Sequence, residues 1–162
     1  MNNSNNSASS RSQLDKKQIV RLWFGLLKNT GETERYLRTQ LHNNFASTLP
    51  QFELLAALDH ADNPLSKTEL SKQMMVSNGN VTWLAKRMVI EGLITLEPAA
   101  LDRRVKLVEL TNKGVADFKK MAVEHEKWLI NIFKDLKNND LNQLFRSLNH
   151  VRIITQNNTI SR

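Results

Sequence analysis

The fold is decided by the segment Val76-Ser-Asn-Gly-Asn-Val-Thr-Trp-Leu-Ala-Lys-Arg-Met-Val-Ile-Glu-Gly92, which holds a complete helix with its own start and stop signals. The Ser77 hydroxyl can accept a hydrogen bond from an unpaired amide of the first turn, and Gly92 tolerates the left-handed conformation that ends many helices. The apolar residues that fall on one side at helical spacing are Val81, Leu84, Ala85 and Met88. The segment therefore predicts a helix of about four turns with one face packed inward.

The opposite face of this helix is polar and basic, and no acid interrupts it before Glu91. Its amide, hydroxyl, indole and cationic groups suit base edges and phosphates. The alternative is an ordinary solvated face, which is what charges on helices usually form. The candidate DNA contacts on and beside this face are Ser77, Asn78, Asn80, Thr82, Trp83, Lys86 and Arg87.

A second, shorter helix is predicted just upstream, from Lys67 to about Met74. Ser66 and Glu69 have the spacing of a capping box, in which each side chain satisfies a backbone amide of the other residue. Only Met75, Val76 and Ser77 separate the two helices, which predicts a helix-turn-helix. Ser66 and Lys67, at the start of this helix, are also candidate DNA contacts.

Two short strands with a basic tip are predicted downstream. Residues 93–97 and 105–110 alternate apolar and polar side chains, and residues 98–104 lie between them. A helix-turn-helix followed by a basic hairpin is a winged helix, whose hairpin contacts the DNA backbone or minor groove. The candidate wing contacts are Asp102, Arg103, Arg104 and Lys106.

At this point the sequence resembles the MarR-type winged-helix repressors over roughly residues 14–157. The most specific part is Asp102-Arg-Arg104, followed six residues later by Leu110-Thr-x-x-Gly114. The resemblance implies that one wing arginine enters the minor groove, while Asp102 orients an arginine through a bidentate pair. Trp83 departs from the family, in which small residues or Arg are more usual at this position.

Three segments are most similar to the branch of this family that represses hydroxycinnamate degradation. They are Ser77-Asn-Gly-Asn-Val-Thr82, Leu49-Pro-Gln-Phe-Glu-Leu-Leu55 and Met121-Ala-x-x-His-Glu-x-Trp128. The branch implies a small aromatic effector such as p-coumarate or ferulate, often as the coenzyme A thioester. It also implies a pocket between the N-terminal helices and the winged helix. The candidate effector contacts are Phe24, Leu41 and Phe45 as walls and Arg21, Arg38 and His42 as donors.

Helices are also predicted on both sides of the winged helix. Before it they cover residues 14–28, 32–45 after a break at Asn29-Thr-Gly31, and 51–59 after a Thr48-Leu-Pro-Gln51 cap. After it they cover residues 111–136 and 141–156, with a break at Asn138-Asn-Asp140. With no sheet to cover them, the terminal apolar stripes must pack on each other or on a second subunit. In the resembled family they form a homodimer.

These patterns predict a mainly α (α+β) chain, a winged helix-turn-helix with N- and C-terminal dimerisation helices. The predicted segments are a disordered tail over residues 1–12, N-terminal helices over 13–47, the DNA-binding domain over 48–111 and C-terminal helices over 112–157.

Composition limits the function classes. Lys and Arg number 23 against 16 Asp and Glu, a net charge of +7 that suits a polyanion such as double-stranded DNA. The chain has no cysteine and no apolar run long enough for a membrane span, which predicts a cytoplasmic protein without a membrane partner. The four histidines lack metal-ligand spacing, and no catalytic motif is present, so neither an enzyme nor a cofactor is predicted. The remaining alternative to a DNA-binding regulator is a helical adaptor that uses its basic face on an acidic protein partner.

Overall fold

The computed structural model describes residues 15–160 of the 162-residue chain, so the tail predicted over residues 1–12 lies outside the described residues. By its internal contacts the chain divides into two units, residues 1–51 and residues 52–162. No helix in the described range is both long and apolar enough to span a membrane.

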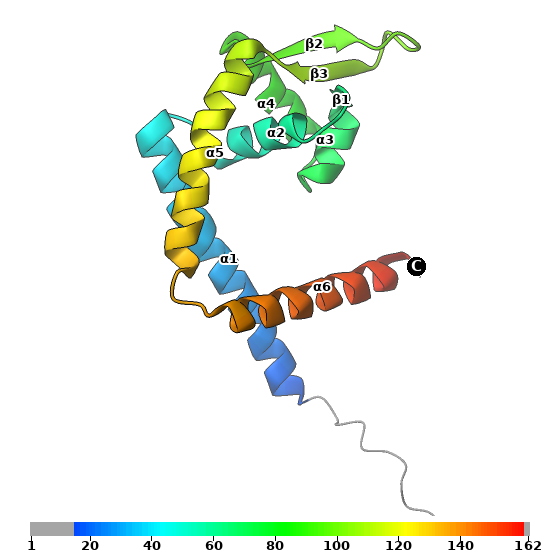
Figure 1. The fold of residues 1–162 in the computed structure, drawn as a ribbon. Coiled ribbons are helices and arrows are strands. Elements are labelled where there is room, and N and C mark those ends of the chain that lie inside the picture. Colours follow the sequence, from blue (N-terminus) through cyan, green and yellow to red (C-terminus); the bar gives the residue numbers. More distant parts are fainter. Residues whose placement is uncertain (1–14, 161–162) are drawn as a thin grey trace, which may run out of the picture. The chain divides into compact units, whose positions relative to one another are not determined.

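The first unit consists mainly of one long helix, α1 (Lys16–Phe45), shown in blue to cyan in Figure 1. Asp15 caps it by accepting a hydrogen bond from the Lys17 amide at 3.0 Å, and Ala46 ends it with a φ of 51°. The predicted break at residues 29–31 is wrong. A glycine inside a helix costs only about 1 kcal/mol relative to alanine, which the long helix around Gly31 outweighs.

Helix α2 (Leu49–Asp59) follows and crosses from the first unit into the second. Its capping box is the predicted one: the Thr48 amide donates to Gln51 Oε1 at 2.9 Å, and the Gln51 amide donates to Thr48 Oγ1 at 3.4 Å. The helix therefore begins directly after Thr48, two residues before the predicted start.

The helix-turn-helix is present as predicted. Helix α3 (Lys67–Gln73) starts at a complete Ser66–Glu69 capping box, and helix α4 (Asn78–Ile90) starts at Ser77. Between them Met75 takes a positive φ of 54°, which lets the chain turn sharply. The buried residues that hold these helices to the rest of the second unit include Leu54, Leu55, Leu70, Val81, Leu84, Ala85 and Met88.

A three-stranded antiparallel sheet with the order β1-β3-β2 completes the winged helix (Figure 1). Strands β2 (Ile94–Pro98) and β3 (Lys106–Leu110) form the predicted hairpin, in register from Ile94 opposite Leu110 to Pro98 opposite Lys106. Strand β1 (Leu65–Ser66) was not predicted, because two residues carry no detectable alternation. It pairs with β3 directly before α3 and so ties the helix-turn-helix to the hairpin.

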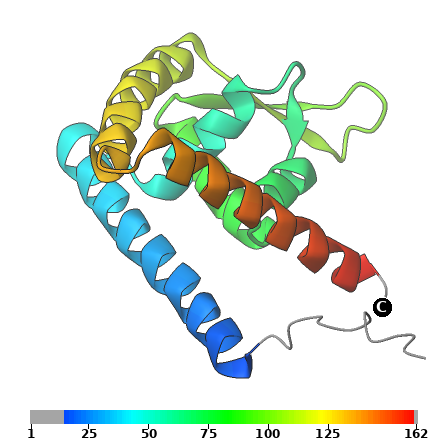
Figure 2. The ribbon, with the colours of Figure 1, turned by 60° about the horizontal axis from the view of Figure 1, so that its bottom comes forward.

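Helices α5 (Asn112–Phe133) and α6 (Asn138–Ile160) end the chain, and Figure 2 shows α6 turning back from the end of α5. The predicted break at residues 138–140 is wrong: the chain leaves helical geometry at residues 134–137, and Asn138 starts α6. Apolar side chains along α6 remain exposed in this chain, among them Leu141, Leu144, Phe145, Leu148, Val151 and Ile154.

Candidate nucleic-acid interface

Helix α4 separates a buried apolar face from an exposed polar face, as its sequence predicts. Val81, Leu84, Ala85 and Met88 are buried. Of the candidate DNA contacts, Ser77, Asn78, Asn80, Trp83, Lys86 and Arg87 are exposed, and Thr82 is half-buried. One face of a single rigid helix thus brings these side chains together, which is the arrangement needed for insertion into a major groove.

The N-terminal end of α4 is held by side chains that also shape the turn. Ser77 Oγ accepts a hydrogen bond from the Asn80 amide at 3.2 Å. Ser71 on α3 donates its hydroxyl to the Val76 carbonyl at 2.9 Å, which fixes the turn before the helix begins. The first turn of α4, where base contacts are made in helix-turn-helix proteins, is therefore positioned by two separate hydrogen bonds.

The C-terminal end of α4 is held by the first turn of α5. Thr111 Oγ1 donates to the Gly92 carbonyl at 2.7 Å, and Lys113 Nζ donates to the Glu91 carbonyl at 3.0 Å. Gly92 has the left-handed φ of 72° that its place after the helix requires. A β-carbon on Gly114 would lie 2.0 Å from the Leu93 carbonyl oxygen, so α5 and the start of β2 touch through backbone. We call these contacts of Thr111, Lys113 and Gly114 the α4–α5 joint.

The charges on the exposed face of α4 are not equivalent. Arg87 Nε donates to Glu91 Oε1 at 2.8 Å, a pair one helical turn apart that was not predicted, although its spacing of four residues is visible in the sequence. Lys86, within the described range, forms no ion pair. Lys86 therefore carries the uncompensated positive charge of this face, while Glu91 fixes the orientation of Arg87.

The wing holds one arginine and leaves the other open. Both carboxylate oxygens of Asp102 accept from Arg104, at 3.0 Å from Nε and 3.0 Å from a terminal nitrogen, and Oδ1 also accepts from the Arg104 amide at 3.0 Å. These bonds lower the pKa of Asp102 and raise the pKa of Arg104. Arg103 is exposed and forms no ion pair among the described residues.

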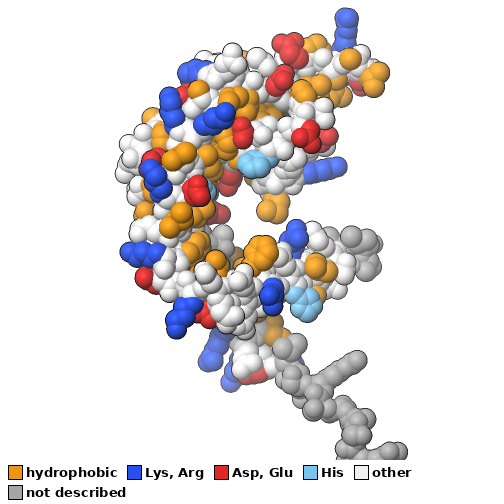
Figure 3. Space-filling model, in the orientation of Figure 1, with side chains coloured by type: hydrophobic (Ala, Val, Ile, Leu, Met, Phe, Trp, Pro, Cys, Tyr) orange, Lys and Arg blue, Asp and Glu red, His pale blue; other side chains and the backbone are white. Residues whose placement is uncertain are grey.

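The remaining predicted DNA contacts lie at the edges of this surface. A cationic side chain projects at the wing tip in the space-filling view (Figure 3), and Lys106 is exposed at the start of β3. Ser66 is half-buried, and its hydroxyl oxygen accepts a hydrogen bond from the Glu69 amide at 3.2 Å, so this side chain is part of the capping box. Lys67 is half-buried in the first turn of α3.

The six candidate effector residues are spread along α1 and do not form one cluster on a single chain. Because α1 is continuous, Arg21 and Phe45 lie 24 positions apart and are separated by roughly 36 Å at a rise of 1.5 Å per residue. The upstream pair, Arg21 and Phe24, is exposed, and Arg21 lines a shallow cavity of about 380 Å³ with neighbouring residues of the same helix. The downstream group is Arg38, which pairs with Glu34 at 3.0 Å, exposed His42, half-buried Phe45 and fully buried Leu41.

An aromatic cluster that was not predicted from the sequence joins α2 to α5. The Phe52 ring stacks on His125 with centroids 4.4 Å apart and meets Phe118 at 5.6 Å, and His125 meets Trp128 edge-on at 6.5 Å. Burial lowers the pKa of His125, because desolvation disfavours the charged imidazolium.

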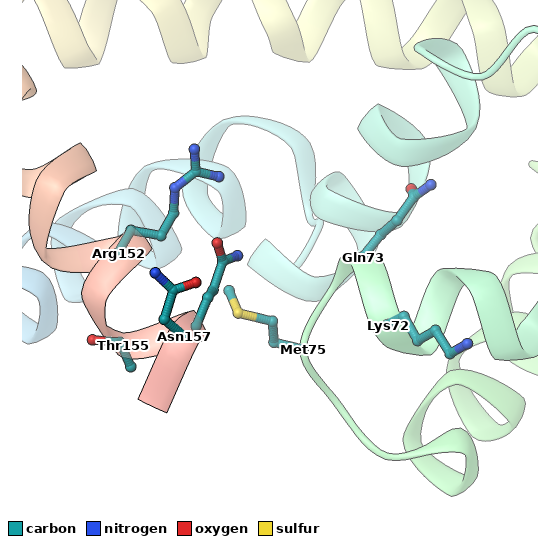
Figure 4. A pocket seen from close by; sticks show the side chains of 7 residues that line it. Lys72, Gln73, Met75, Arg152, Thr155 and Asn157 are labelled. Carbon is teal, nitrogen blue, oxygen red and sulfur yellow. The ribbon is translucent and has the colours of Figure 1, made fainter. Parts of the chain in front are cut away.

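A hollow of about 1000 Å³ in the second unit is an open groove between α3 and the end of α6 (Figure 4). In Figure 4 Met75 points toward the α6 side, while Lys72 and Gln73 point away from Arg152. The two cationic side chains that line this groove, Lys72 and Arg152, therefore do not converge on one point. Among the described residues no group of acidic or histidine side chains could hold a metal ion.

Comparison with known proteins supports this geometry. The model of the MarR family matches residues 48–105, which contain the helix-turn-helix and most of the wing. The chain is 24% identical to an uncharacterised HTH-type transcriptional regulator of Bacillus cereus over 127 residues, 78% of this chain and 83% of the relative. It is 30% identical to the transcriptional activatory protein BadR of Rhodopseudomonas palustris over 113 residues, 67% of this chain and 61% of the relative.

Solved structures share the fold over most of the chain. AbsC, a MarR family regulator from Streptomyces coelicolor, has a TM-score of 0.77 and 23% identity, with 91% of this chain and 99% of AbsC covered. A MarR variant from E. coli complexed with operator DNA has a TM-score of 0.74 and 24% identity, with 83% of this chain and 95% of the MarR chain covered. CouR from Rhodococcus jostii bound to p-coumaroyl-CoA has a TM-score of 0.70 and 15% identity, with 80% of this chain and 90% of CouR covered. The MarR family model thus matches the helix-turn-helix and most of the wing, and these solved structures share the fold over most of the chain.

Proposed function

We propose that this chain is a ligand-responsive repressor that binds a pseudo-palindromic operator as a homodimer. The observation that carries the proposal is the exposed face of α4, on which Asn80, Trp83 and Lys86 stand free while the opposite face is buried. The wing adds a second contact region, since Arg103 is free and Arg104 is held by Asp102. One region suits base edges and the other suits phosphates or a minor groove.

The homodimer is supported by apolar side chains that one chain leaves exposed. On α6 they follow the three- and four-residue spacing of a packed helix, as in Leu141, Leu144 and Leu148, which are between 42% and 46% exposed. Exposed patches of this kind mark interaction surfaces, and closed symmetric dimers are the commonest solution. Two recognition helices in such a dimer would meet half-sites about 34–36 Å apart.

The test of DNA recognition is a gel shift on the upstream region of the protein's own gene, followed by footprinting. Specific binding should fall linearly in log affinity with log salt, because each phosphate contact releases counterions. Asn80→Ala should cost about 1–3 kcal/mol and relax specificity at one position in each half-site. The matched control is Asn112→Ala, which changes an exposed asparagine at the start of α5. Equal affinity and footprint for the wild type and Asn80→Ala would contradict this orientation of α4.

The effector we propose is a hydroxycinnamate such as p-coumarate or ferulate, or its coenzyme A thioester. It is supported by the segments that resemble the hydroxycinnamate branch and by the shared fold of CouR, which was solved with p-coumaroyl-CoA. On α1 the downstream group Arg38, His42 and Phe45 lies within two turns and offers cationic, polar and aromatic surface. We therefore place the site there, and not at Arg21 and Phe24.

Linkage makes the effector testable, because a ligand that prefers the off-DNA state weakens operator binding by the same factor. Titration of p-coumaroyl and feruloyl thioesters and of the free acids should release the protein from its operator. Arg38→Ala should blunt that response and leave DNA affinity nearly unchanged, whereas Arg35→Ala, an exposed neighbour on the same helix, should not blunt it. A gel shift unchanged by all four compounds would refute the effector and leave the operator-binding reading intact.

The sign of regulation has its own test, since the relative BadR is named an activatory protein. When the gene is deleted, expression of a reporter fused to the operator region should rise if the protein represses and fall if it activates.

The alternative function, a helical adaptor, predicts a different result in the gel shift and footprint: capture of an acidic protein partner and no footprint on any duplex.

A further inference from the structure

We propose that Trp83 reads a thymine methyl group in each half-site of the operator. This inference rests on the proposed function, because it assumes that α4 enters a major groove. It goes further by assigning a base and an atom group to one side chain. Trp83 thereby becomes a specificity-determining residue.

The first observation is the exposure of the ring. Trp83 is 64% exposed in the middle of α4, at a position whose neighbours Val81 and Leu84 are buried. Within residues 15–158, whose side chains are described, no hydrogen bond or ring contact involves Trp83. A large apolar ring exposed on a mostly polar face is unfavourable in water and becomes favourable once it covers another apolar group.

The second observation is the open space on the preceding turn of the helix. Side chains on a helix lean toward its N-terminus and cover the residues three and four positions earlier. For Trp83 these are Asn80 and Gly79. Gly79 has no side chain, and a β-carbon built there would meet only Ser77 Oγ, at 3.8 Å. The helix itself therefore leaves room for the indole to lie flat beside a base edge.

The chemistry of the groove then selects the partner. The major-groove edges of all four bases present polar donors and acceptors, and thymine alone adds a methyl group, at C5. An indole face buries that methyl without leaving a donor or acceptor unpaired. Asn80, on the same side of the helix, carries the amide that pairs bidentately with adenine. The two side chains together would read neighbouring A·T pairs.

The experiment replaces thymine by uracil, which removes only the methyl group. Duplexes selected from a random pool by the full-length protein define the operator, and each thymine is then changed singly to uracil. One thymine in each half-site should lose roughly fourfold in affinity, the equivalent of one buried methyl group, and uracil at both should lose roughly sixteenfold. Trp83→Ala should bind both duplexes equally, and Trp83→Phe should keep part of the preference. Lys86→Ala should bind less tightly overall and retain the full thymine-to-uracil ratio.

Each result decides the inference. A uracil effect that disappears in Trp83→Ala and persists in Trp83→Phe and Lys86→Ala supports it. Specific binding with no uracil-sensitive position overturns it and leaves the proposed function standing. A uracil effect of the same size in Trp83→Ala also overturns it, since another side chain must then contact the methyl. Failure to select any sequence overturns both the inference and the proposed operator.

Discussion

Replacing Gly114 by alanine should destabilise the protein strongly, because this glycine lies at the α4–α5 joint. The added β-carbon would stand 2.0 Å from the Leu93 carbonyl oxygen, 3.0 Å from its carbon and 3.3 Å from Leu110 Cδ2. Two of these atoms are backbone, so relief requires the first turn of α5 to move away from the start of β2. Overpacking of a tight site costs about 1–3 kcal/mol, and the movement would also stretch the 2.7 Å hydrogen bond from Thr111 Oγ1 to the Gly92 carbonyl, so we expect about 3 kcal/mol or more.

The assay is thermal unfolding of the purified variants, with urea midpoints as a second measure. For a chain of this length a destabilisation of about 3 kcal/mol lowers Tm by roughly 6–12 °C. Gly31→Ala is the matched control: no heavy atom lies within 4 Å of its β-carbon position, and removing a glycine from the interior of α1 should stabilise by about 0.5–1 kcal/mol. A Gly114→Ala protein as stable as the wild type would refute the close backbone approach.

Four other predictions concern the turn, the aromatic cluster and the wing. Met75→Gly should stabilise by about 1 kcal/mol in the same unfolding assay, because Met75 has a φ of 54° and is 90% exposed, so its side chain packs on little else. Because burial lowers the pKa of His125, the neutral side chain contributes its full stability above the ordinary histidine pKa of about 6.5, and this contribution declines as the pH falls further. The Tm of the His125→Phe variant should therefore drop less between pH 7.5 and 5.5 than that of the wild type. Arg103→Ala should reduce the slope of log affinity against log salt by about 0.9 for each phosphate that the arginine neutralises in the wild type, and an unchanged slope would place Arg103 away from the backbone. Asp102→Asn should weaken DNA binding in the gel shift because Arg104 is released, whereas simple charge repulsion predicts tighter binding for the same variant.

Signals carried by neighbouring residues made the DNA-binding unit predictable. The capping boxes at Thr48 and Ser66 and the cap at Ser77 each need only residues within three positions, and all three are formed. The same is true of the hairpin, whose strands differ from the predicted ranges by one residue at their ends.

The features that were not predicted from the sequence arise where longer-range interactions override the local preferences of the residues. The residues Asn29-Thr-Gly31 have weak helix propensity, but thirty residues of helix with regular hydrogen bonds outweigh them. The two-residue strand β1 exists because β3 offers it a partner far along the chain. The effector residues were predicted on two helices that could have folded together, and a single helix instead spreads them along its length.

The division of α4 into buried and exposed positions has a consequence for evolution. Substitutions at Asn78, Asn80 or Trp83 change no buried contact, since these side chains face outward, while Val81 and Met88 secure the helix regardless of what the outer face carries. If α4 reads an operator as proposed, its base preference can therefore change after gene duplication at little cost in folding stability. Duplicated copies of such a gene could acquire separate target sites while keeping one scaffold, and the same freedom would let a designer retarget the protein by exchanging only the outer side chains of α4.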